Sequence, residues 1–348
     1  MIDGLRLVSR TALGRDAWNA FVDASDDAWL WHRSEFQEAL ATWPRRNDRS
    51  FALIDPNGRD RVQAVVPVQL VRNRLGLASI ESFGGPAFPN SIRRKHRIRL
   101  FDTVRHHLAE MGKQVHAGSI AVGMPPLAPN LRSERCPRVN PLIEAGFDNC
   151  ISQTWLVDLS GGDEAVWGRM EGRARTAVRK AEKAGVAVRV ADRPNDIDVY
   201  YSLHRETYER TGVRAHPKAY FEAIWRELLP QGLARVWIAE LNGDAVAAEN
   251  FAVYKGAAWY WTGAATTTGL DVEANSMLQW HAMRWMMCAG VRWYDTGEAF
   301  PQARSGKLKG LSDFKRSFGG ELSPVFRGTL RGGSLCHRIV RAILTLKQ

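Results

Sequence analysis

The sequence lacks the features of several common protein classes. The four cysteines form no CxxC pair and no zinc-ligand spacing, so neither a disulfide framework nor a structural zinc site is expected. No run of about 18 apolar residues occurs, so no transmembrane helix is expected. The first residues lack the long apolar core of a signal peptide. Together with the cysteine usage, this predicts a cytoplasmic protein.

Motifs of several well-known chemistries are also missing. The sequence has no Gly-x-Ser-x-Gly elbow, no P-loop and no Rossmann glycine fingerprint. The nine histidines do not combine with acids or cysteines at metal-ligand spacing. A serine hydrolase, an NTPase and a dinucleotide-dependent oxidoreductase are therefore not predicted, and no metal site is expected.

Lysine is scarce, although the chain as a whole is basic. The 48 basic residues comprise 38 Arg and 10 Lys, and against 37 acidic residues they leave a formal net charge of +11. This excess allows an anionic partner such as nucleic acid, a phosphorylated substrate or an acidic membrane. Because it is spread over both halves of the chain, it disfavours a dedicated nucleic-acid arm. The length of 348 residues suggests two domains.

Both halves show the same order of predicted elements: two helices, a strand, an Asn-Gly turn, two strands, a helix and a strand. The two turns are Asn57-Gly58 and Asn242-Gly243, the second a tight hairpin turn. In the first half, the apolar run 62–71 is expected to pair with 51–55 as a hairpin. Helices before a hairpin-rich sheet, followed by a crossover helix, predict an α+β fold with mixed, mainly antiparallel sheets.

Two windows carry much of the positive charge of the second half. Residues 166–184 show one apolar stripe at helical spacing, flanked by cations that include Arg175 and Arg179. Residues 304–316 hold five basic residues, Lys309 among them, and one acid. Planar guanidinium groups suit phosphate, so the first window is either a phosphate clamp or a solvated basic face.

Three residues are candidates for the chemistry. Lys315 lies between an aromatic residue, Phe314, and a Phe-Gly-Gly turn, where its compact charge suits an oxyanion or a phosphate. The alternative is a surface lysine. Asp295 ends a predicted strand beside a glycine, where it suits either proton acceptance from an amine or capping of the turn. Glu249 is the other candidate base.

Aromatic residues and further basic segments complete the set of candidates. Tyr260 and Trp261, on a predicted strand, are expected either to line an acceptor groove or to belong to the core. The basic run 93–99 suits contact with nucleic acid or the exposed face of a helix. Residues 334–348 form an amphipathic pattern that is typical of a helix on an anionic membrane or of one docked on its own domain.

The segments 173–190, 275–299 and 310–322 carry a more specific likeness. Their order and spacing resemble the FemAB/FemX-type family, which are tandem-GNAT proteins that include peptidoglycan-bridge aminoacyltransferases. They are also similar to its BioF2-like and CelD-like relatives in polysaccharide biosynthesis. The resemblance implies two tandem GNAT-like domains with the acyl-CoA N-acyltransferase fold, at 1–147 and 148–330. A C-terminal amphipathic helix would follow at 331–348.

The resemblance also implies a function. The protein would move an acyl or aminoacyl group to an amine on a phosphate-bearing precursor of cell-envelope polysaccharide or peptidoglycan. Lys315, Glu249 and Asp295 would then be catalytic. The substrate-binding residues would be Arg175, Arg179, Tyr260, Trp261, Phe314 and Lys309. Peripheral contact with the inner membrane would run through 334–348.

The donor is left open by the sequence. Acetyl-CoA or another acyl-CoA is one expectation, and aminoacyl-tRNA is the other. The loop 269–276 lacks the second glycine of a pyrophosphate-binding loop and carries two acids, which disfavours CoA in the usual GNAT mode. The rival hypothesis is a non-catalytic, degenerate GNAT module that binds an anionic glycolipid or nucleic acid.

Overall fold

The computed structural model describes residues 4–58 and 60–331, which form two compact units. Unit 1 comprises residues 4–152 and 325–331, and unit 2 comprises residues 153–324. The domain ranges expected from the sequence, 1–147 and 148–330, assign the last strand to the second domain. In the structure, its residues from 325 onward belong to unit 1. That strand, β15 (Glu321–Arg331), begins in unit 2 and pairs along its second half with β7 (Ser119–Met124) of unit 1. The pairing covers what would otherwise be an open sheet edge. The expected helix 331–348 and the membrane contact of 334–348 lie outside the described residues, apart from Arg331 itself.

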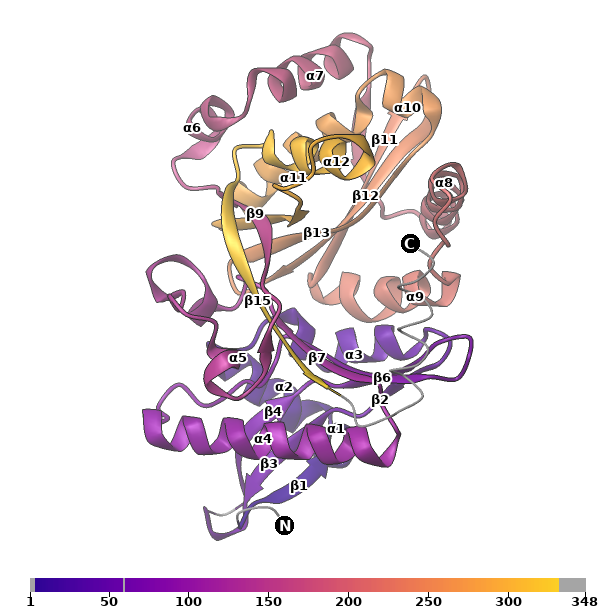
Figure 1. Cartoon of the computed structure of the whole chain (residues 1–348). Coiled ribbons are helices and arrows are strands. Elements are labelled where there is room, and N and C mark those ends of the chain that lie inside the picture. Colours follow the sequence, from indigo (N-terminus) through magenta and orange to yellow (C-terminus); the bar gives the residue numbers. More distant parts are fainter. Residues whose placement is uncertain (1–3, 59, 332–348) are drawn as a thin grey trace. The chain divides into compact units, whose positions relative to one another are not determined.

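Unit 1 contains two sheets, coloured indigo to magenta in Figure 1 except for the yellow strand β15. Three antiparallel strands, β1, β3 and β4, form the smaller sheet, and the larger has the order β15-β7-β6-β5-β2. The strands are β1 (Arg6–Ser9), β2 (Arg46–Asp48), β3 (Phe51–Asp55), β4 (Arg61–Val66), β5 (Gln69–Arg72), β6 (Ala78–Phe83) and β8 (Asp148–Asn149), which pairs with β15. The helices are α1 (Arg10–Leu13), α2 (Arg15–Ala24), α3 (Ser34–Ala41), α4 (Arg94–Gln114) and α5 (Pro141–Glu144).

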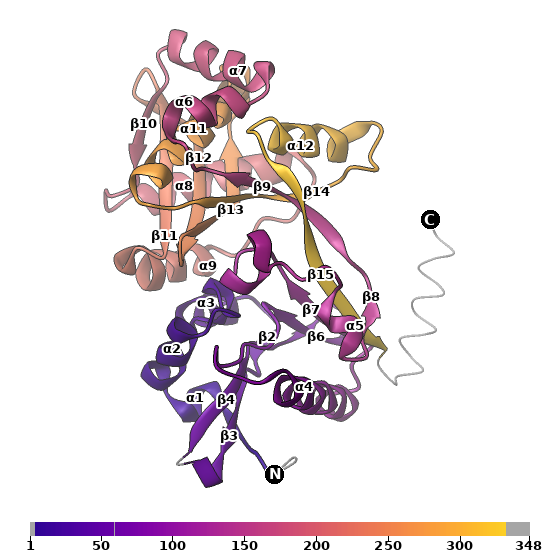
Figure 2. The same cartoon turned by 90° about the vertical axis from the view of Figure 1, so that its left-hand side faces the viewer.

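A crossover helix connects the one parallel strand pair described in the larger sheet of unit 1. Strands β6 and β7 run parallel, and α4 joins them while packing on β4, β6 and β7 (Figures 1 and 2). The run 62–71, expected as a single strand, is divided at Pro67 into β4 and β5, which belong to different sheets. Proline has no backbone N–H for a strand ladder, which explains the break.

Unit 2 is built on one mixed sheet with the order β10-β11-β12-β13-β14-β9. Its strands are β9 (Ser152–Asp158), β10 (Ala187–Val190), β11 (Ala234–Leu241), β12 (Asp244–Tyr254), β13 (Ala257–Ala265) and β14 (Trp293–Ala299). Its helices are α6 (Gly162–Arg169), α7 (Gly172–Lys183), α8 (Asp196–Arg210), α9 (Lys218–Ala223), α10 (Thr267–Asp271), α11 (Ala274–Cys288) and α12 (Gly306–Arg316). The mixed, mainly antiparallel sheets predicted from the sequence are confirmed, because the paired strands β6–β7 and β13–β14 run parallel and the other described ladders are antiparallel.

The predicted hairpin turn at Asn242-Gly243 is confirmed. Both residues have positive φ, 53° and 90°, as a two-residue turn between β11 and β12 requires. Helix α11 packs on β11, β12 and β13, and α8 packs on β12 and β13. Because alternate residues of a strand point to opposite faces, neighbouring residues of β12 contact different helices.

The apolar stripe predicted over 166–184 is not one continuous helix. It is divided between α6 and α7 at Met170 and Glu171, which both have extended backbone angles. The apolar residues of both helices still face one core, where Val166, Met170 and Val178 are buried. The apolar periodicity therefore predicted the buried face correctly. It did not reveal the break, because a tight turn between two helices can leave the same face buried.

Candidate functional site

Strand β14 places two buried polar groups next to each other in unit 2. Tyr294 and Asp295 are neighbours on this strand, with exposed fractions of 0% and 3%. The parallel ladder between β14 and β13 is registered over only three residue pairs, 293–295 with 257–259. Beyond these pairs, the backbones of β13 and β14 are not paired with each other, so the polar residues that follow on each strand can interact with other groups.

The first group is centred on Glu249, which lies on β12 and is fully buried. Its Oε2 accepts a hydrogen bond of 2.7 Å from Nε2 of Gln279 on α11. The Tyr294 hydroxyl donates to Oε1 of the same glutamine. Burial raises the pKa of Glu249 well above its ordinary value, and hydrogen bonds from Gln279 and Tyr260 oppose this rise only in part. Burial therefore favours the neutral, protonated form of this carboxyl group.

Tyr260 reaches this group because of a glycine and a strand irregularity. The register between β12 and β13 shifts at Asn250, which pairs with Thr262, while Phe251 pairs with Tyr260. Trp261 is the extra residue of this bulge. A Cβ atom on Gly263 would collide with the Tyr260 hydroxyl. Gly263 thus leaves the space that the tyrosine ring occupies beside Glu249.

The second group joins Asp295 and Lys315. One carboxylate oxygen, Oδ1 of Asp295, accepts hydrogen bonds from the Thr154 hydroxyl and, at 2.7 Å, from the backbone N–H of Gly297. Lys315, on α12, is 8% exposed, and its Nζ donates to the carbonyl of Glu298 at 3.1 Å. A Cβ on Gly297 would lie 2.8 Å from that Nζ, so the glycine makes room for the ammonium group.

Burial shifts both ionisable groups of this pair. It raises the pKa of Asp295 to about 6, against the hydrogen bonds from Thr154 and Gly297 and the positive charge of Lys315. It lowers the pKa of Lys315, against the negative charges of Asp295 and Glu298. Perturbed groups that support each other's charged form are typical of functional sites.

Helix α12 is held in place by polar contacts at its inner face. Oγ of Ser312 accepts from Trp155 Nε1 at 3.2 Å and from the backbone N–H of Phe300 at 3.0 Å. Phe314 packs edge-on against Phe318, with ring centroids 5.0 Å apart. These contacts orient the helix so that Lys315 faces inward while Lys309, four residues from its ion-pair partner Asp313, stays at the surface.

In the structure, the two basic segments 166–184 and 304–316 contact each other, although they are far apart in the sequence. Glu171, at the start of α7, forms ion pairs of 2.9 Å with Arg173 and 2.8 Å with Arg316 of α12. The Arg173 guanidinium also donates to the carbonyl of Asp313. The clusters therefore form one surface beside Lys315, which the sequence pattern did not reveal because the contacts span more than 100 residues.

The two predicted phosphate ligands on α7 both contact the chain itself. Arg175 donates to the carbonyls of Trp167, Gly168 and Met170, which are the last ones of α6 and of the turn after it. Arg179 lies over the Trp167 ring, 5.4 Å from its centroid. Arg175 thus stabilises the break between the two helices, and phosphate binding by either arginine stays a prediction.

Trp261 lies apart from the carboxyl groups, among other aromatic rings. Its ring stacks near Trp259 at 5.5 Å and meets Tyr220 edge-on at 5.9 Å. Sequence reasoning had named Glu249, Tyr260, Asp295 and Lys315, and it missed Thr154, Gln279 and Tyr294. A glutamine within the apolar run of helix 274–288 was the one available signal.

The loop before α11 does not fit a CoA pyrophosphate. Glu273 has a left-handed backbone (φ 62°), and its carbonyl accepts from the N–H groups of Ser276 and Met277. Its carboxylate accepts from the Ser276 hydroxyl at 3.4 Å, so a negative charge already lies at this helix start. Gly269 lies close against the Val246 carbonyl and serves packing. The residues therefore disagree with the usual phosphate-binding mode.

Other ligand and membrane features were also sought. In residues 4–58 and 60–331, no group of three or more His, Cys, Asp or Glu side chains is arranged to hold a metal ion. Over the same ranges, every helix is too short or too polar to cross a bilayer.

Residues 168–316 match the family model described as an acetyltransferase (GNAT) domain, a class for which acyl-CoA is the general donor. Among curated proteins, none matches the chain. Among solved structures, FemX is similar, with 18% identity and a TM-score of 0.68 over 92% of this chain and 96% of its own.

Two further structures are similar over nearly their whole length. The C-terminal domain of a lysylphosphatidylglycerol synthetase from Agrobacterium fabrum shows 15% identity and a TM-score of 0.60, covering 96% of each chain. A tandem GNAT protein from the clavulanic acid biosynthesis pathway shows 12% identity and a TM-score of 0.56, covering 94% of this chain and 99% of its own. Residues 168–316 thus match an acetyltransferase (GNAT) domain, and the whole chain has the tandem-GNAT fold.

Proposed function

We propose that the chain transfers an acyl or aminoacyl group to an amine on a phosphate-bearing precursor of cell-envelope polysaccharide or peptidoglycan. The observation that carries the proposal is the buried Lys315–Asp295 pair beside Gly297. Likeness in fold to FemX and to a synthetase named for a lysyl-phospholipid supports an envelope acceptor.

The pair suits a direct transfer without a protein nucleophile. The amine nitrogen attacks the donor's carbonyl carbon, a C–N bond forms, and negative charge develops on the carbonyl oxygen. The ammonium group of Lys315 stabilises this oxyanion in a site of low polarity. The attacking nitrogen releases its proton to Asp295, whose pKa of about 6 keeps it ionised at pH 7.5. The bond to the leaving group then breaks, and the leaving group takes the electron pair and a proton.

Glu249 has a different role in this proposal. Because burial raises the pKa of its carboxyl group and favours the protonated form, we assign it the role of a hydrogen-bond donor and not that of the base. Its Oε1 atom is buried without a hydrogen-bond partner among the described residues. Hydrogen bonds from Gln279 and Tyr260 hold the carboxyl group in place. We assign it the positioning of the substrate's polar groups, with Tyr260 as its neighbour in the site.

The positive surface near Lys315 supplies the proposed phosphate contact. Arg304 and Lys307 are exposed and have no ion-pair partner among the described residues, whereas Arg173, Arg316 and Lys309 are paired. Unpaired cations at the start of α12 can bind a phosphate without first breaking an ion pair. Arg179, Trp261 and Phe314 stay proposed contacts of the same acceptor.

The donor follows from the misfit at the start of α11. Because Glu273 disfavours a pyrophosphate there, the proposal takes aminoacyl-tRNA as the donor. The assay compares aminoacyl-tRNA with acetyl-CoA in the presence of UDP-linked and lipid-linked amine acceptors. Transfer from acetyl-CoA alone would show that CoA binds in a different mode and would overturn this choice of donor.

The test of the site is Lys315→Ala with Lys309→Ala as the matched control. We expect Lys315→Ala to lower the transfer rate by about 10²–10³-fold, the usual effect of removing one oxyanion donor. Lys309→Ala should leave the rate nearly unchanged, because its ammonium group is paired with Asp313. Unchanged turnover by Lys315→Ala would remove this residue from the mechanism. Binding of RNA or glycolipid without any turnover by the unaltered protein would favour the non-catalytic alternative.

A further inference from the structure

The first turns of α4, in unit 1, carry a group of exposed cations. Arg93, Arg94, Lys95 and Arg99 are exposed, and none of their charged side-chain groups has a hydrogen-bond or ion-pair partner among the described residues. Arg97, between them, is paired with Asp27 at 2.7 Å. Other arginines of unit 1 pair with carboxylates, as in Arg10–Asp48, Arg33–Glu35, Arg46–Glu81 and Arg135–Asp26.

This arrangement opposes the stability of the helix. The N-terminal end of a helix carries the positive end of its dipole, and the first turn of α4 has no acidic residue to balance it. Lys95 and Arg99 are also like charges four residues apart, which is unfavourable on a helix surface. An anionic partner would compensate for both effects, whereas in its absence the cations repel each other and the helix end.

Aliphatic side chains lie beside these cations. A groove of about 260 Å³ lies between α4 and α5. Figures 1 and 2 show these two helices next to each other. Arg94 and Ile98 line it, and Ile98 is 48% exposed. Val139, just before α5, and Ile143, within α5, are exposed as well. Of the two acids that line the groove, Asp102 is engaged by Arg105 at 2.8 Å, and Glu144 lies at the end of α5.

We propose that this surface, formed by the start of α4 and by α5, docks the protein on an anionic phospholipid membrane. Exposed aliphatic groups among lysine and arginine are typical of interfacial binding, where the cations meet lipid phosphates and the aliphatic groups enter the headgroup layer. Residues 91–99 contain no Phe, Tyr or Trp, so the platform for stacking bases that single-stranded nucleic acid uses is missing from this segment. The inference does not depend on the transfer reaction proposed above.

The test is sedimentation of the full chain with vesicles of phosphatidylcholine alone or mixed with phosphatidylglycerol. We expect binding only to the mixed vesicles, with an affinity that falls as salt rises. The variant Arg94→Gln/Lys95→Gln/Arg99→Gln should bind roughly 100-fold more weakly, from about one factor of five per cation. The control Arg74→Gln/Arg205→Gln/Arg214→Gln removes the same charge from exposed positions elsewhere and should bind nearly as the unaltered protein does.

Two further measurements keep the proposal falsifiable. Far-UV circular dichroism should be unchanged in both variants, because all six side chains are exposed. The melting temperature should be unchanged in the control and equal or slightly higher in the α4 variant, because repulsion at the helix start is relieved. Equal losses in the two variants, or no loss in the α4 variant, would overturn the proposal. Loss of affinity for RNA in the α4 variant, without vesicle binding by the unaltered protein, would assign the surface to nucleic acid instead. Transfer to a soluble acceptor should be unaffected by the α4 variant.

Discussion

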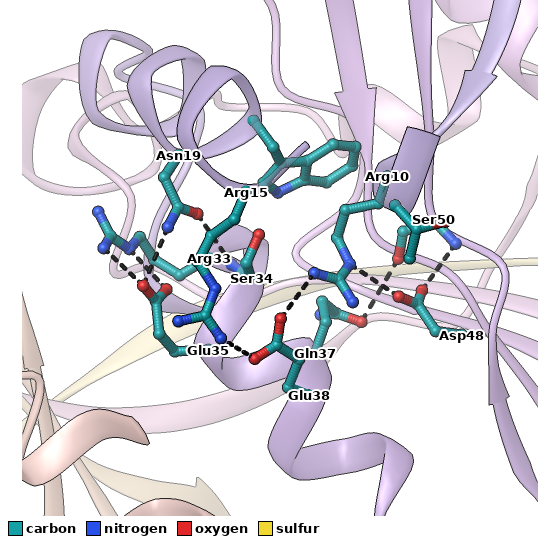
Figure 3. Close-up of polar contacts among 12 residues, drawn as sticks. Arg10, Arg15, Asn19, Arg33, Ser34, Glu35, Gln37, Glu38, Asp48 and Ser50 are labelled. Carbon is teal, nitrogen blue, oxygen red and sulfur yellow. Dashed lines mark hydrogen bonds and ion pairs between the residues drawn. The ribbon is translucent and has the colours of Figure 1, made fainter. Parts of the chain in front are cut away.

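The two units bury polar side chains in different ways. In unit 1, buried charges form a network of mutual pairs, shown in Figure 3. Arg33 binds both Glu35 and Asp23, Asn19 donates to Glu35, and Arg10 binds Asp48 at 2.7 Å. Each charge in this network is compensated by a partner of opposite sign, which is what burial of a charge requires for stability.

In unit 2, burial leaves several polar groups incompletely compensated. Burial raises the pKa of Glu249. Within the described part of the chain, one oxygen of Glu249 and both polar side-chain atoms of the neighbouring Asn250 lack a hydrogen-bond partner. Asp295 and Lys315 retain pKa values shifted toward neutrality. The polar network of unit 1 thus compensates its own charges, whereas that of unit 2 is the one for which we propose an interaction with a ligand.

The largest expected difference between the units comes from two equivalent substitutions. Glu35→Gln in unit 1 should lower the free energy of unfolding by about 3 kcal/mol, because it removes one of the two charges that compensate the largely buried Arg33. Glu249→Gln in unit 2 should change it by less than about 1 kcal/mol, because burial favours the neutral form of that carboxyl group and the amide has a similar volume. Urea unfolding of both variants measures this. Equal destabilisation would contradict the distinction between the two networks.

A second prediction concerns the pH dependence of stability in unit 2. Folding raises the pKa of Asp295 from about 3.8 to about 6, so the folded state holds the proton more tightly than the unfolded state. The contribution of this group is therefore present below about pH 4 and is lost as pH rises to about 6, by up to about 3 kcal/mol. The Asp295→Asn variant should lack this contribution to the pH dependence of stability. Its amide oxygen can still accept the hydrogen bond from the Gly297 N–H.

Urea unfolding of the unaltered protein and of Asp295→Asn between pH 4 and 7 measures the effect. The difference in unfolding free energy between the two proteins should shift in favour of the variant as pH rises. Asp158→Asn is a suitable control, because its pKa is lowered and its dependence has the opposite sign. A constant difference between the unaltered protein and Asp295→Asn across this range would contradict the shift.

The smallest expected effect concerns the space beside Glu249. Gly263→Ala places a methyl group against the Tyr260 hydroxyl and should cost about 1–2 kcal/mol through displacement of the ring. Tyr260→Phe combined with Gly263→Ala should cost less than the sum of the single changes, because the hydroxyl contact is gone. Unfolding measurements on the three variants give the coupling. Additive effects would show that glycine and tyrosine do not share this space.

Several local features could be predicted from the sequence, because they depend on neighbouring residues. The Asn242-Gly243 turn follows from the positive φ angles that these residues tolerate. Lys315, Asp295 and Glu249 were identified from their positions beside glycines or on an alternating strand. The break at Met170–Glu171 was missed, because two short helices can continue one apolar stripe. The division at Pro67 was missed too, although proline is a known reason for a strand to end.

The contacts that assemble the site could not be predicted, because they join distant segments. Thr154 and Asp295 are separated by 141 positions, and Glu171 and Arg316 by 145. The sequence predicted that Arg175 binds a phosphate, whereas in the structure it donates to backbone carbonyls at the end of α6. A cation on a predicted helix looks the same whether it binds a phosphate or the carbonyls of the preceding helix.

The sequence by itself determined the order of elements, the excess of positive charge and the absence of a nucleophile motif. These follow from composition and from local backbone preferences. Only the tertiary structure decided which charges are paired and which are buried. Charge state depends on desolvation, and desolvation depends on which distant segments pack around a group. For this reason Glu249, Asp295 and Lys315 differ from the protein's many other charged residues only after the chain has folded.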